Sequence, residues 1–287
     1  YTYHFGANAD KKERAKAFED LYINPTVDFI WSVGGGEWMM DIIPLIDFEK
    51  LKSYPPKYIM GYSDNTNLTF LMNTLLDTAS IYGQNFAEFG MKPWDKSLDE
   101  ALEIISGQRF KQHKYDDHEH KNKVELDPLA PYTLSEHTPW KSLSKRHNIQ
   151  IEGRLIGGCL DILMLYPGLK YDQVDNFNET YKHDGIIWFL EACDLNLFGI
   201  KRGLWQLKEA GWFKHLKGII IGRPLNGDTL IDITHEAVLH DIFDELEVEV
   251  LYDLDFGHIA PTFTIISGAI ATISYNKGQG SIEYKLK

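Results

Sequence analysis

Residues 57–66, KYIMGYSDNT, decide how this chain folds. The first five, KYIMG, contain the apolar run Tyr58-Ile59-Met60 and end at a glycine, as expected of a short strand. Residues 63–66 (SDNT) are four good helix N-caps in a row. The apolar residues beyond them recur at the i, i+3, i+4 spacing of a helix that buries one face, and they are Leu68, Leu71, Met72, Leu75 and Leu76. The stretch therefore predicts a strand, a tight turn at Ser63 and a helix.

The same alternation extends along the chain in both directions. Further strand-like runs lie at residues 27–33, 185–190 and 218–222, and helical patterns lie at 12–22, 38–46, 159–166, 201–210 and 234–246. Strands that alternate with helices predict a parallel sheet. Residues 248–287 are rich in strand patterns. The predicted fold class is α/β, with an amino-terminal parallel α/β sheet domain and a smaller, strand-rich carboxy-terminal α/β domain.

Residues 107–150 interrupt this pattern. They are polar and contain five histidines, at positions 113, 118, 120, 137 and 147. A long segment without periodicity is typical of a connection between domains or of an insertion near a site. We therefore expect an amino-terminal domain at residues 1–106, a connecting segment at 107–150 and a carboxy-terminal domain at 151–287.

Composition restricts the class of partner. The chain has 287 residues, 29 basic and 42 acidic, with a formal net charge of −13. Nucleic-acid binding needs clustered basic residues, so neither a nucleic acid nor an anionic membrane surface is expected as a partner. A small anionic ligand stays possible, because a local pocket can differ in sign from the whole molecule.

The two cysteines, Cys159 and Cys193, form neither a disulfide framework nor a CxxC pair. No apolar run approaches the roughly 20 residues that span a bilayer, and no secretory signal is recognisable. We expect a cytoplasmic protein. The chain begins with interior-like sequence and no initiator Met, so a fragment is expected and the missing signal weighs little.

Ser63 occupies the turn where an α/β sheet places reactive groups. The carboxyl edge of the sheet is where such sites form, and the amino end of the following helix offers N–H groups and a positive dipole to an oxyanion. The turn resembles the nucleophile elbow G-x-S-x-G, with Asn65 in place of the second glycine. From the turn alone we favour helix capping by Ser63 or Asp64, which is the commoner use of such residues.

A second strand end carries Gly34-Gly35-Gly36. Glycines there let backbone N–H groups approach a ligand closely, as in an oxyanion hole or a phosphate cradle. The loop is neither G-x-G-x-x-G nor a Walker loop. A tight turn without a ligand fits it equally well.

Glu191 ends the apolar strand at 185–190, and His258 follows the apolar and acidic run at 248–254. Each alone fits a solvated strand end or a loop residue. Together with Ser63 they make the set needed for nucleophilic acyl transfer, in the chain order serine, acid, histidine.

Two other features have weaker functional interpretations. The cluster at residues 116–120 (DDHEH) lacks the H-E-x-x-H spacing of a helical metal site, so we expect a solvated polar loop and no metal. Trp140 lies outside the periodic elements, where it could stack on a planar ligand group.

An ordered series of motifs resembles the LD-carboxypeptidase family. The motifs are GGG at residues 34–36, GYSDNT at 61–66, GGCLD at 157–161, FLE at 189–191, GIIIGRP at 218–224 and FGH at 256–258. The series favours Ser63 as a nucleophile over a cap. The 107–150 segment and EGRLIGGC at 152–159 look more like the microcin C immunity branch than the murein-recycling branch.

The resemblance implies a serine peptidase or amidase without metal or cofactor that forms homodimers. Ser63 would be the nucleophile, His258 the general base and acid, and Glu191 the carboxylate that orients His258. The oxyanion donors would be the backbone N–H of Asp64 and one from Gly35 or Gly36. The family also opens with a strand and a Pro-Ser turn upstream of the residues matched here, so we expect the first sheet to lack a strand.

Three functions remain open from the sequence. One is hydrolysis of an aminoacyl-nucleotide antibiotic of the microcin C type, which the immunity branch implies. The second is cleavage of a murein tetrapeptide with an L,D bond. The third belongs to another class, a non-catalytic protein that holds an anion or nucleotide at the glycine loop and the helix amino end.

Overall fold

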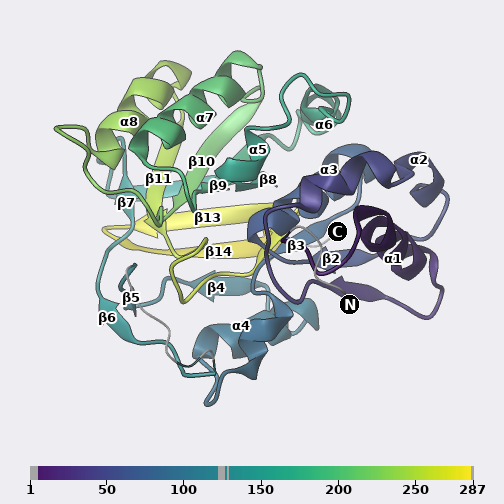
Figure 1. Cartoon of the computed structure of the whole chain (residues 1–287). Helices are drawn as coiled ribbons and strands as arrows, with labels where there is room; N and C mark the ends of the chain where they lie inside the picture. The colour runs from purple at the N-terminus through teal and green to yellow at the C-terminus, as the bar shows by residue number, and fades with distance from the viewer. Residues whose placement is uncertain (1–5, 122–126, 128, 286–287) are drawn as a thin grey trace.

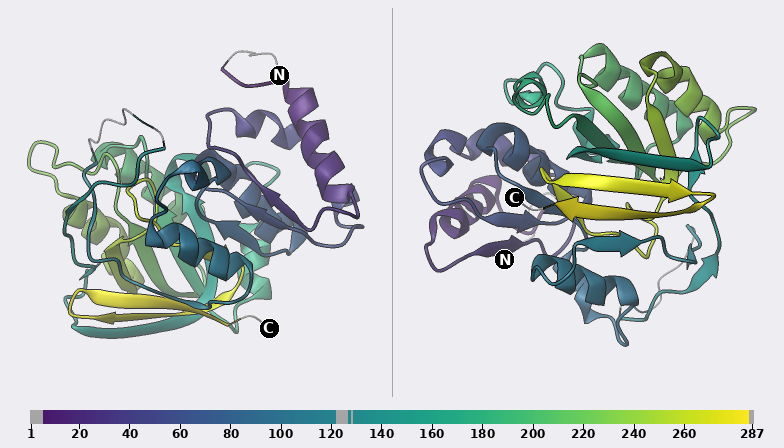
Figure 2. Two further views of the ribbon diagram at one scale, coloured as in Figure 1. Left: turned by 90° about the horizontal axis from the view of Figure 1, so that it is seen from below. Right: turned by 180° about the vertical axis from the view of Figure 1, so that it is seen from behind.

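The computed structural model describes residues 6–121, 127 and 129–285. Two sheets build the molecule, one of four strands in the order β1-β2-β3-β12 and one of eight in the order β4-β14-β13-β8-β9-β10-β11-β7, beside a two-stranded ribbon, β5-β6. The amino-terminal helices and strands lie beside the eight-stranded sheet (Figures 1 and 2). The predicted α/β class is confirmed.

The four-stranded sheet begins with three parallel strands. These are β1 (Phe29–Trp31), β2 (Tyr58–Met60) and β3 (Ser80–Tyr82), with Phe29 opposite Tyr58 and Met60 opposite Ile81. Its helices are α1 (Lys11–Ile23), α2 (Phe48–Leu51) and α3 (Thr66–Leu76). The strand, turn and helix predicted around Ser63 are therefore present as β2, the 3-10 turn η3 (Ser63–Asn65) and α3.

The helix expected at residues 38–46 is instead two short 3-10 turns, η1 (Met39–Asp41) and η2 (Ile43–Leu45). Pro44 lacks an N–H and its ring would clash with a preceding carbonyl inside a helix, so it sits in the first turn of η2. The proline thus explains why apolar periodicity gave the wrong element here.

The eight-stranded sheet has a parallel centre and antiparallel flanks. The strands at its centre are β8 (Asn148–Cys159), β9 (Ile186–Glu191), β10 (Leu216–Gly222) and β11 (Glu249–Leu254), and β13 (Ile270–Asn276) and β14 (Gln279–Lys285) continue the β8 side. Helices α5 (Leu160–Leu163), α7 (Leu197–Glu209) and α8 (His235–Phe243) cover one face, and α4 (Lys96–Ile105) lies on the other side (Figure 1). A further helix, α6 (Val174–Thr180), follows α5.

The connecting segment at 107–150 is part of this sheet. Strand β4 (Lys111–His113) pairs with β14 at one edge, and β7 (Lys141–Ser142) pairs with β11 at the other. Between them β5 (His118–Glu119) pairs with β6 (Leu134–Glu136). Edge strands bond on one side only and are commonly short and polar, which is why hydrophobic periodicity missed them. The boundaries at 106/107 and 150/151 stay predictions.

The last strand of the first sheet comes from the other end of the sequence. Strand β12 (Ile265–Ser267) runs antiparallel to β3, with Ile266 opposite Ile81. The Ser267 hydroxyl also donates to the amide oxygen of Asn73 on α3 at 2.5 Å. The carboxy-terminal residues thus interlock the two sheets.

Helix α3 is held between the sheets by its close approach to β8. A Cβ on Gly158 would lie 2.5 Å from Cγ2 of Thr66, so only glycine allows this contact. The Thr66 hydroxyl accepts a hydrogen bond from the backbone N–H of Cys159 at 3.1 Å. Cys159 of β8 lies opposite Glu191 of β9 in the parallel register of these two strands, so the amino end of α3 lies beside the carboxyl end of β9.

Aromatic packing reinforces this arrangement. The Phe70 ring of α3 stacks on Trp212 at 5.3 Å, and Trp212 stacks on Trp188 of β9 at 5.4 Å. All three are buried. Among the described residues, no helix combines the length and the apolar character required to cross a membrane.

Candidate active site

Ser63 adopts a left-handed backbone conformation, with φ of 64°. A residue with a side chain is strained there, and the strained turn between a strand and a helix is what presents a nucleophile at an elbow. Such strain has no use in a simple helix cap, which has extended backbone angles. The conformation of Ser63 therefore favours the nucleophile interpretation.

Asn65 explains the departure from the G-x-S-x-G pattern. Its side-chain amide donates to the backbone oxygens of Gly34 and Tyr62, both at 3.0 Å. A Cβ on Gly61 would lie 2.8 Å from the Asn65 side chain, so glycine at 61 leaves room for it. Asn65 thus ties the serine turn to the glycine loop.

The glycine loop lies directly against the serine. A Cβ on Gly35 would be 3.2 Å from the Ser63 hydroxyl oxygen, and one on Gly36 would be 3.2 Å from a carboxylate oxygen of Asp64. The buried Asp64 carboxylate accepts hydrogen bonds from the backbone N–H of Met39 and from the Asn67 amide, both at 2.9 Å. The Asp64 side chain therefore ties the serine turn to the backbone of Met39, three residues beyond the glycine loop.

Glu191 and His258 form a pair beside this turn. Glu191 is the last residue of β9 and 1% exposed, and its Oε2 lies 2.9 Å from Nδ1 of His258. Burial by itself lowers the pKa of His258, but the Glu191 carboxylate outweighs it and raises that pKa well above its ordinary 6.5. Burial by itself raises the pKa of Glu191, but the interactions with His258 and Tyr82 outweigh the effect of burial, and the pKa of Glu191 is lowered from its ordinary value. Glu191 is thus ionised and orients the imidazole through Nδ1.

Gly257 makes this pairing possible. Its φ is 109°, and a Cβ there would lie 2.9 Å from Oε2 of Glu191. A side chain at 257 would meet the carboxylate oxygen that His258 uses. In the Phe256-Gly257-His258 motif, the glycine leaves room for the Glu191 carboxylate and the histidine supplies the imidazole that pairs with it.

The third contact of a triad is open in this structure. Nε2 of His258 is buried and has no hydrogen-bond partner among the described residues, so the Ser63 hydroxyl is not bonded to it. The Tyr62 ring, next to Ser63 in the chain, lies 5.0 Å from the imidazole between ring centres. Catalytic hydrogen bonds are often open without substrate and tighten when it binds.

Tyr82 is a residue of this region that sequence reasoning missed. Its hydroxyl donates to Oε1 of Glu191 at 2.5 Å and accepts a longer contact from the backbone N–H of Ser63 at 3.4 Å. A signal existed, because Tyr82 ends β3, the third parallel strand of the sheet whose first two strands end at the glycine loop and at Ser63. The carboxyl ends of parallel strands share one edge.

Trp140 does not face a ligand site. It is 1% exposed, its indole N–H donates to Asp255 at 2.7 Å, and its ring packs on Phe263. The structure does not support the stacking role expected from the sequence. Trp140 directly precedes the edge strand β7, and its ring is buried in the core.

The 116–120 cluster is not simply solvated, as the sequence suggested. His118 and Glu119 are buried, and the His118 ring contacts the backbone oxygen of Glu119 at 2.8 Å and the Thr138 hydroxyl at 2.9 Å. The short β5-β6 ribbon explains this burial. In the described ranges no group of three or more His, Cys, Asp or Glu side chains is placed to hold a metal ion.

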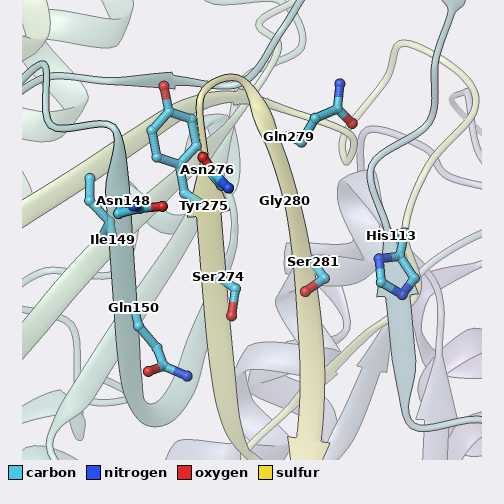
Figure 3. A pocket seen from close by; sticks show the side chains of 10 residues that line it. All are labelled: His113, Asn148, Ile149, Gln150, Ser274, Tyr275, Asn276, Gln279, Gly280 and Ser281. Carbon is cyan, nitrogen blue, oxygen red and sulfur yellow. The ribbon is translucent and has the colours of Figure 1, made fainter.

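Two cavities differ in their relation to this site. One, of about 670 Å³, is lined by the glycine loop, Asp64, Asn65 and α1, next to the serine turn. The other, of about 530 Å³, is a hollow over β4, β14, β13 and β8, with Gln150, Ser274 and His113 around it (Figure 3). It lies at the start of β8, whereas Glu191 is beside the end of that strand. Of these two cavities, it is the first that adjoins the candidate site.

Family profiles match both parts of the chain. The LD-carboxypeptidase N-terminal domain matches residues 2–83, and the LD-carboxypeptidase C-terminal domain matches residues 152–273. The chain belongs to the LD-carboxypeptidase family, a class of peptidases, as the motif series indicated.

Two curated relatives and one solved structure illustrate the similarity. The chain is 26% identical over 285 residues to the microcin C7 self-immunity protein MccF of Escherichia coli, covering 94% of this chain and 78% of that protein. It is 24% identical over 296 residues to murein tetrapeptide carboxypeptidase of Pseudomonas aeruginosa, covering 96% of this chain and 84% of that protein. The structure of MccF in complex with glutamyl sulfamoyl guanosine superposes with a TM-score of 0.78 at 24% identity, over 99% of this chain and 84% of that one, which establishes the shared fold.

Proposed function

We propose that this protein is a serine hydrolase that cleaves an amide bond next to a carboxylate-bearing residue, with Ser63, His258 and Glu191 as its triad. The observation that carries the proposal is the strained serine turn, with φ of 64° at Ser63, lying beside the Glu191–His258 pair. Membership of a peptidase family supports it.

The proposed reaction is acyl transfer to Ser63. His258 accepts the hydroxyl proton on Nε2 and returns it to the leaving amine, while Glu191 holds the ring through Nδ1. The backbone N–H of Asp64 and one from Gly35 or Gly36 stabilise the oxyanion, each contributing about 3 kcal/mol. Water then hydrolyses the acyl-enzyme.

The proposed substrate is an aminoacyl-nucleotide of the microcin C type. MccF is named as the microcin C7 self-immunity protein, and one solved structure shows MccF in complex with glutamyl sulfamoyl guanosine. The alternative is a murein tetrapeptide, supported by the similarity to murein tetrapeptide carboxypeptidase. We further propose that the protein acts in the cytoplasm as a homodimer, which light scattering on the purified chain would test by its mass.

Replacement of Ser63 by Ala tests the nucleophile. Turnover of any cleavable substrate should fall to background while thermal unfolding and ligand binding stay near those of the parent protein. Ser106→Ala is the control, because Ser106 is an exposed serine at the end of α4 and should keep full activity. Full activity in Ser63→Ala would rule out the assignment.

Substrate class is tested by offering both compounds. The purified protein is incubated with an aminoacyl sulfamoyl nucleoside and with a murein tetrapeptide, and products are followed by mass spectrometry. Release of the free amino acid from the first supports the proposal, and release of a terminal D-residue from the second supports the alternative. Binding without turnover of either, and no labelling of Ser63 by a fluorophosphonate, would instead indicate a non-catalytic binding protein.

A further inference from the structure

We propose that Tyr82 is a positioning residue of this active site, whose hydroxyl ties the backbone of Ser63 to the carboxylate that orients His258. The proposal rests on the function proposed above, and it adds a fourth residue to the three that the motif series indicates. Tyr82 lies on β3 of the first sheet and Glu191 on β9 of the second, so this hydroxyl crosses from one sheet to the other.

The direction of the hydrogen bonds is fixed by the groups involved. Glu191 is ionised and can only accept, so the Tyr82 hydroxyl donates to its Oε1 at 2.5 Å. Burial, with the nearby Glu191 charge, raises the pKa of Tyr82 well above 10.0, so the phenol keeps the proton that it donates. Its oxygen then has a lone pair for the N–H of Ser63, at 3.4 Å.

The two oxygens of Glu191 therefore have different partners. Oε2 pairs with Nδ1 of His258 at 2.9 Å, and Oε1 pairs with Tyr82. A carboxylate bonded at both oxygens cannot rotate without losing one bond. Tyr82 thus sets the plane of Glu191, which in turn sets the imidazole ring.

The ring of Tyr82 is itself held rigidly. It is 1% exposed and packs on Phe189 of β9 at 5.4 Å and on Tyr62 at 6.3 Å between ring centres. The aromatic packing persists when only the hydroxyl is removed. Tyr82→Phe therefore tests the hydroxyl rather than the fold.

The hydroxyl also affects how His258 binds its proton. When His258 is neutral, Glu191 retains a full buried charge that the Tyr82 hydroxyl stabilises, whereas protonated His258 neutralises much of that charge. Loss of the hydroxyl destabilises the neutral form more, so the pKa of His258 should rise. The groups that surround the pair and stay unchanged in this variant are Tyr62, Glu88, Cys159 and Cys193.

Tyr284→Phe is a matched control. Tyr284 is also a buried tyrosine whose hydroxyl accepts from one side chain, Gln112 at 3.1 Å, and donates to one oxygen, that of Thr264 at 2.7 Å. It lies on β14, outside the candidate site. A loss of stability or activity that both variants share is attributed to the removal of a buried hydroxyl in general, and not to the position of Tyr82.

In Tyr82→Phe, kcat should fall on the order of 10- to 100-fold with little change in KM, because positioning is lost and binding is not. The acidic limb of the pH profile should move to higher pH, and Tyr284→Phe should show neither effect. An unchanged profile and kcat in Tyr82→Phe, or equal losses in both variants, would overturn the proposal.

Titration of the His258 ring by NMR separates this inference from the proposed function. If the parent protein turns over no substrate and is not labelled at Ser63 by a fluorophosphonate, the proposed function fails. The Tyr82 contact is still tested by the ring, whose pKa should be higher in Tyr82→Phe than in the parent protein. An unchanged His258 pKa would refute the coupling whatever the activity.

Discussion

At the scale of single residues, the candidate site concentrates strain and buried charge in one place. Ser63 has a left-handed backbone, and the buried Glu191 carboxylate pairs with His258 beside it. Unfavourable local conformations persist only where the surrounding structure imposes them, and they cluster at functional sites. Here the imposing contacts are the Asn65 amide bonds and the packing of α3 on β8.

The strain at Ser63 predicts a difference between two inactive variants. Ser63→Ala keeps a Cβ in the left-handed region, whereas Ser63→Gly relieves the strain. We expect Ser63→Gly to exceed Ser63→Ala in free energy of unfolding by about 1 kcal/mol. Urea denaturation of the two proteins measures this difference. A Ser63→Ala protein as stable as Ser63→Gly would show that the turn is not strained.

The Glu191–His258 pair predicts a pH effect. His258 must be neutral to act as a base, and Glu191 raises its pKa, so activity should rise with pH through that raised value. Glu191→Gln removes the charge and lowers the pKa of His258, which moves the acidic limb of kcat/KM to lower pH. The variant should also lose about 10²- to 10⁴-fold in kcat, because the ring is no longer held in the required tautomer.

The measurement is kcat/KM from pH 5 to 11.5 for both proteins, with circular dichroism to verify folding at each pH. A limb that stays in place or moves to higher pH in Glu191→Gln would contradict the pairing. The shift is opposite in sign to the one expected for Tyr82→Phe, so the two variants report different contacts of the same carboxylate.

At the scale of elements, the position of α3 on β8 decides whether the serine reaches the pair. The contact depends on Gly158, whose φ is 147° and whose added Cβ would meet Thr66 at 2.5 Å. The loop after β9 is held by the neighbouring Asp161, whose carboxylate accepts from the backbone N–H groups of residues 193, 194 and 195 at 3.0, 2.8 and 3.1 Å. The GGCLD motif thus positions both the amino end of α3 and the loop after β9.

Gly158→Ala should therefore displace the amino end of α3. We expect a loss of about 1–3 kcal/mol in stability from overpacking and a fall in kcat, since Ser63 moves with the helix. Gly168→Ala is the control, because Gly168 also has a positive φ, 80°, but no atom lies within 4 Å of an added Cβ. It should cost about 1 kcal/mol from backbone strain and leave kcat unchanged.

Thermal unfolding and steady-state kinetics of the two variants provide the comparison. If Gly168→Ala and Gly158→Ala lost equal stability and both kept full kcat, the contact between α3 and β8 would have no part in the site.

At the scale of the whole molecule, the two sheets depend on each other. The first sheet takes its fourth strand, β12, from residues 265–267, and the second takes both edge strands from the 107–150 segment. Tyr82 and Asn73 add side-chain bonds between the parts. The three-part division expected from the sequence therefore describes the order of the chain better than it describes independent units.

We accordingly predict that a fragment of residues 1–106 does not fold alone. Without β12, strand β3 loses its antiparallel partner and the buried face of α3 loses β8 and β9. The fragment should show no cooperative thermal transition by circular dichroism and a poorly dispersed NMR spectrum. The full chain is the control, and a cooperative transition in the fragment would contradict the prediction.

The sequence by itself determined what is local. The strand, turn and helix at residues 57–76 follow from apolar spacing and N-cap residues, and the ordered motifs indicated the LD-carboxypeptidase family, which the matched domains confirm. Local patterns were wrong at 38–46, where a proline breaks the helix, and were silent about β4 and β7, because edge strands need no apolar alternation.

Only the tertiary structure decided which side chains from distant parts of the sequence lie close together. Ser63, Glu191 and His258 are far apart in sequence, and neither their spacing nor their composition states a distance. The sequence did not indicate Tyr82 as a site residue, because its proposed role depends on a contact between the two sheets. The expectation for Trp140 was wrong because the local sequence pattern does not predict that the residue beside an edge strand is buried. Residues close in the chain determine secondary structure. Long-range packing decides which polar side chains come into contact, and the candidate site is built from such long-range contacts.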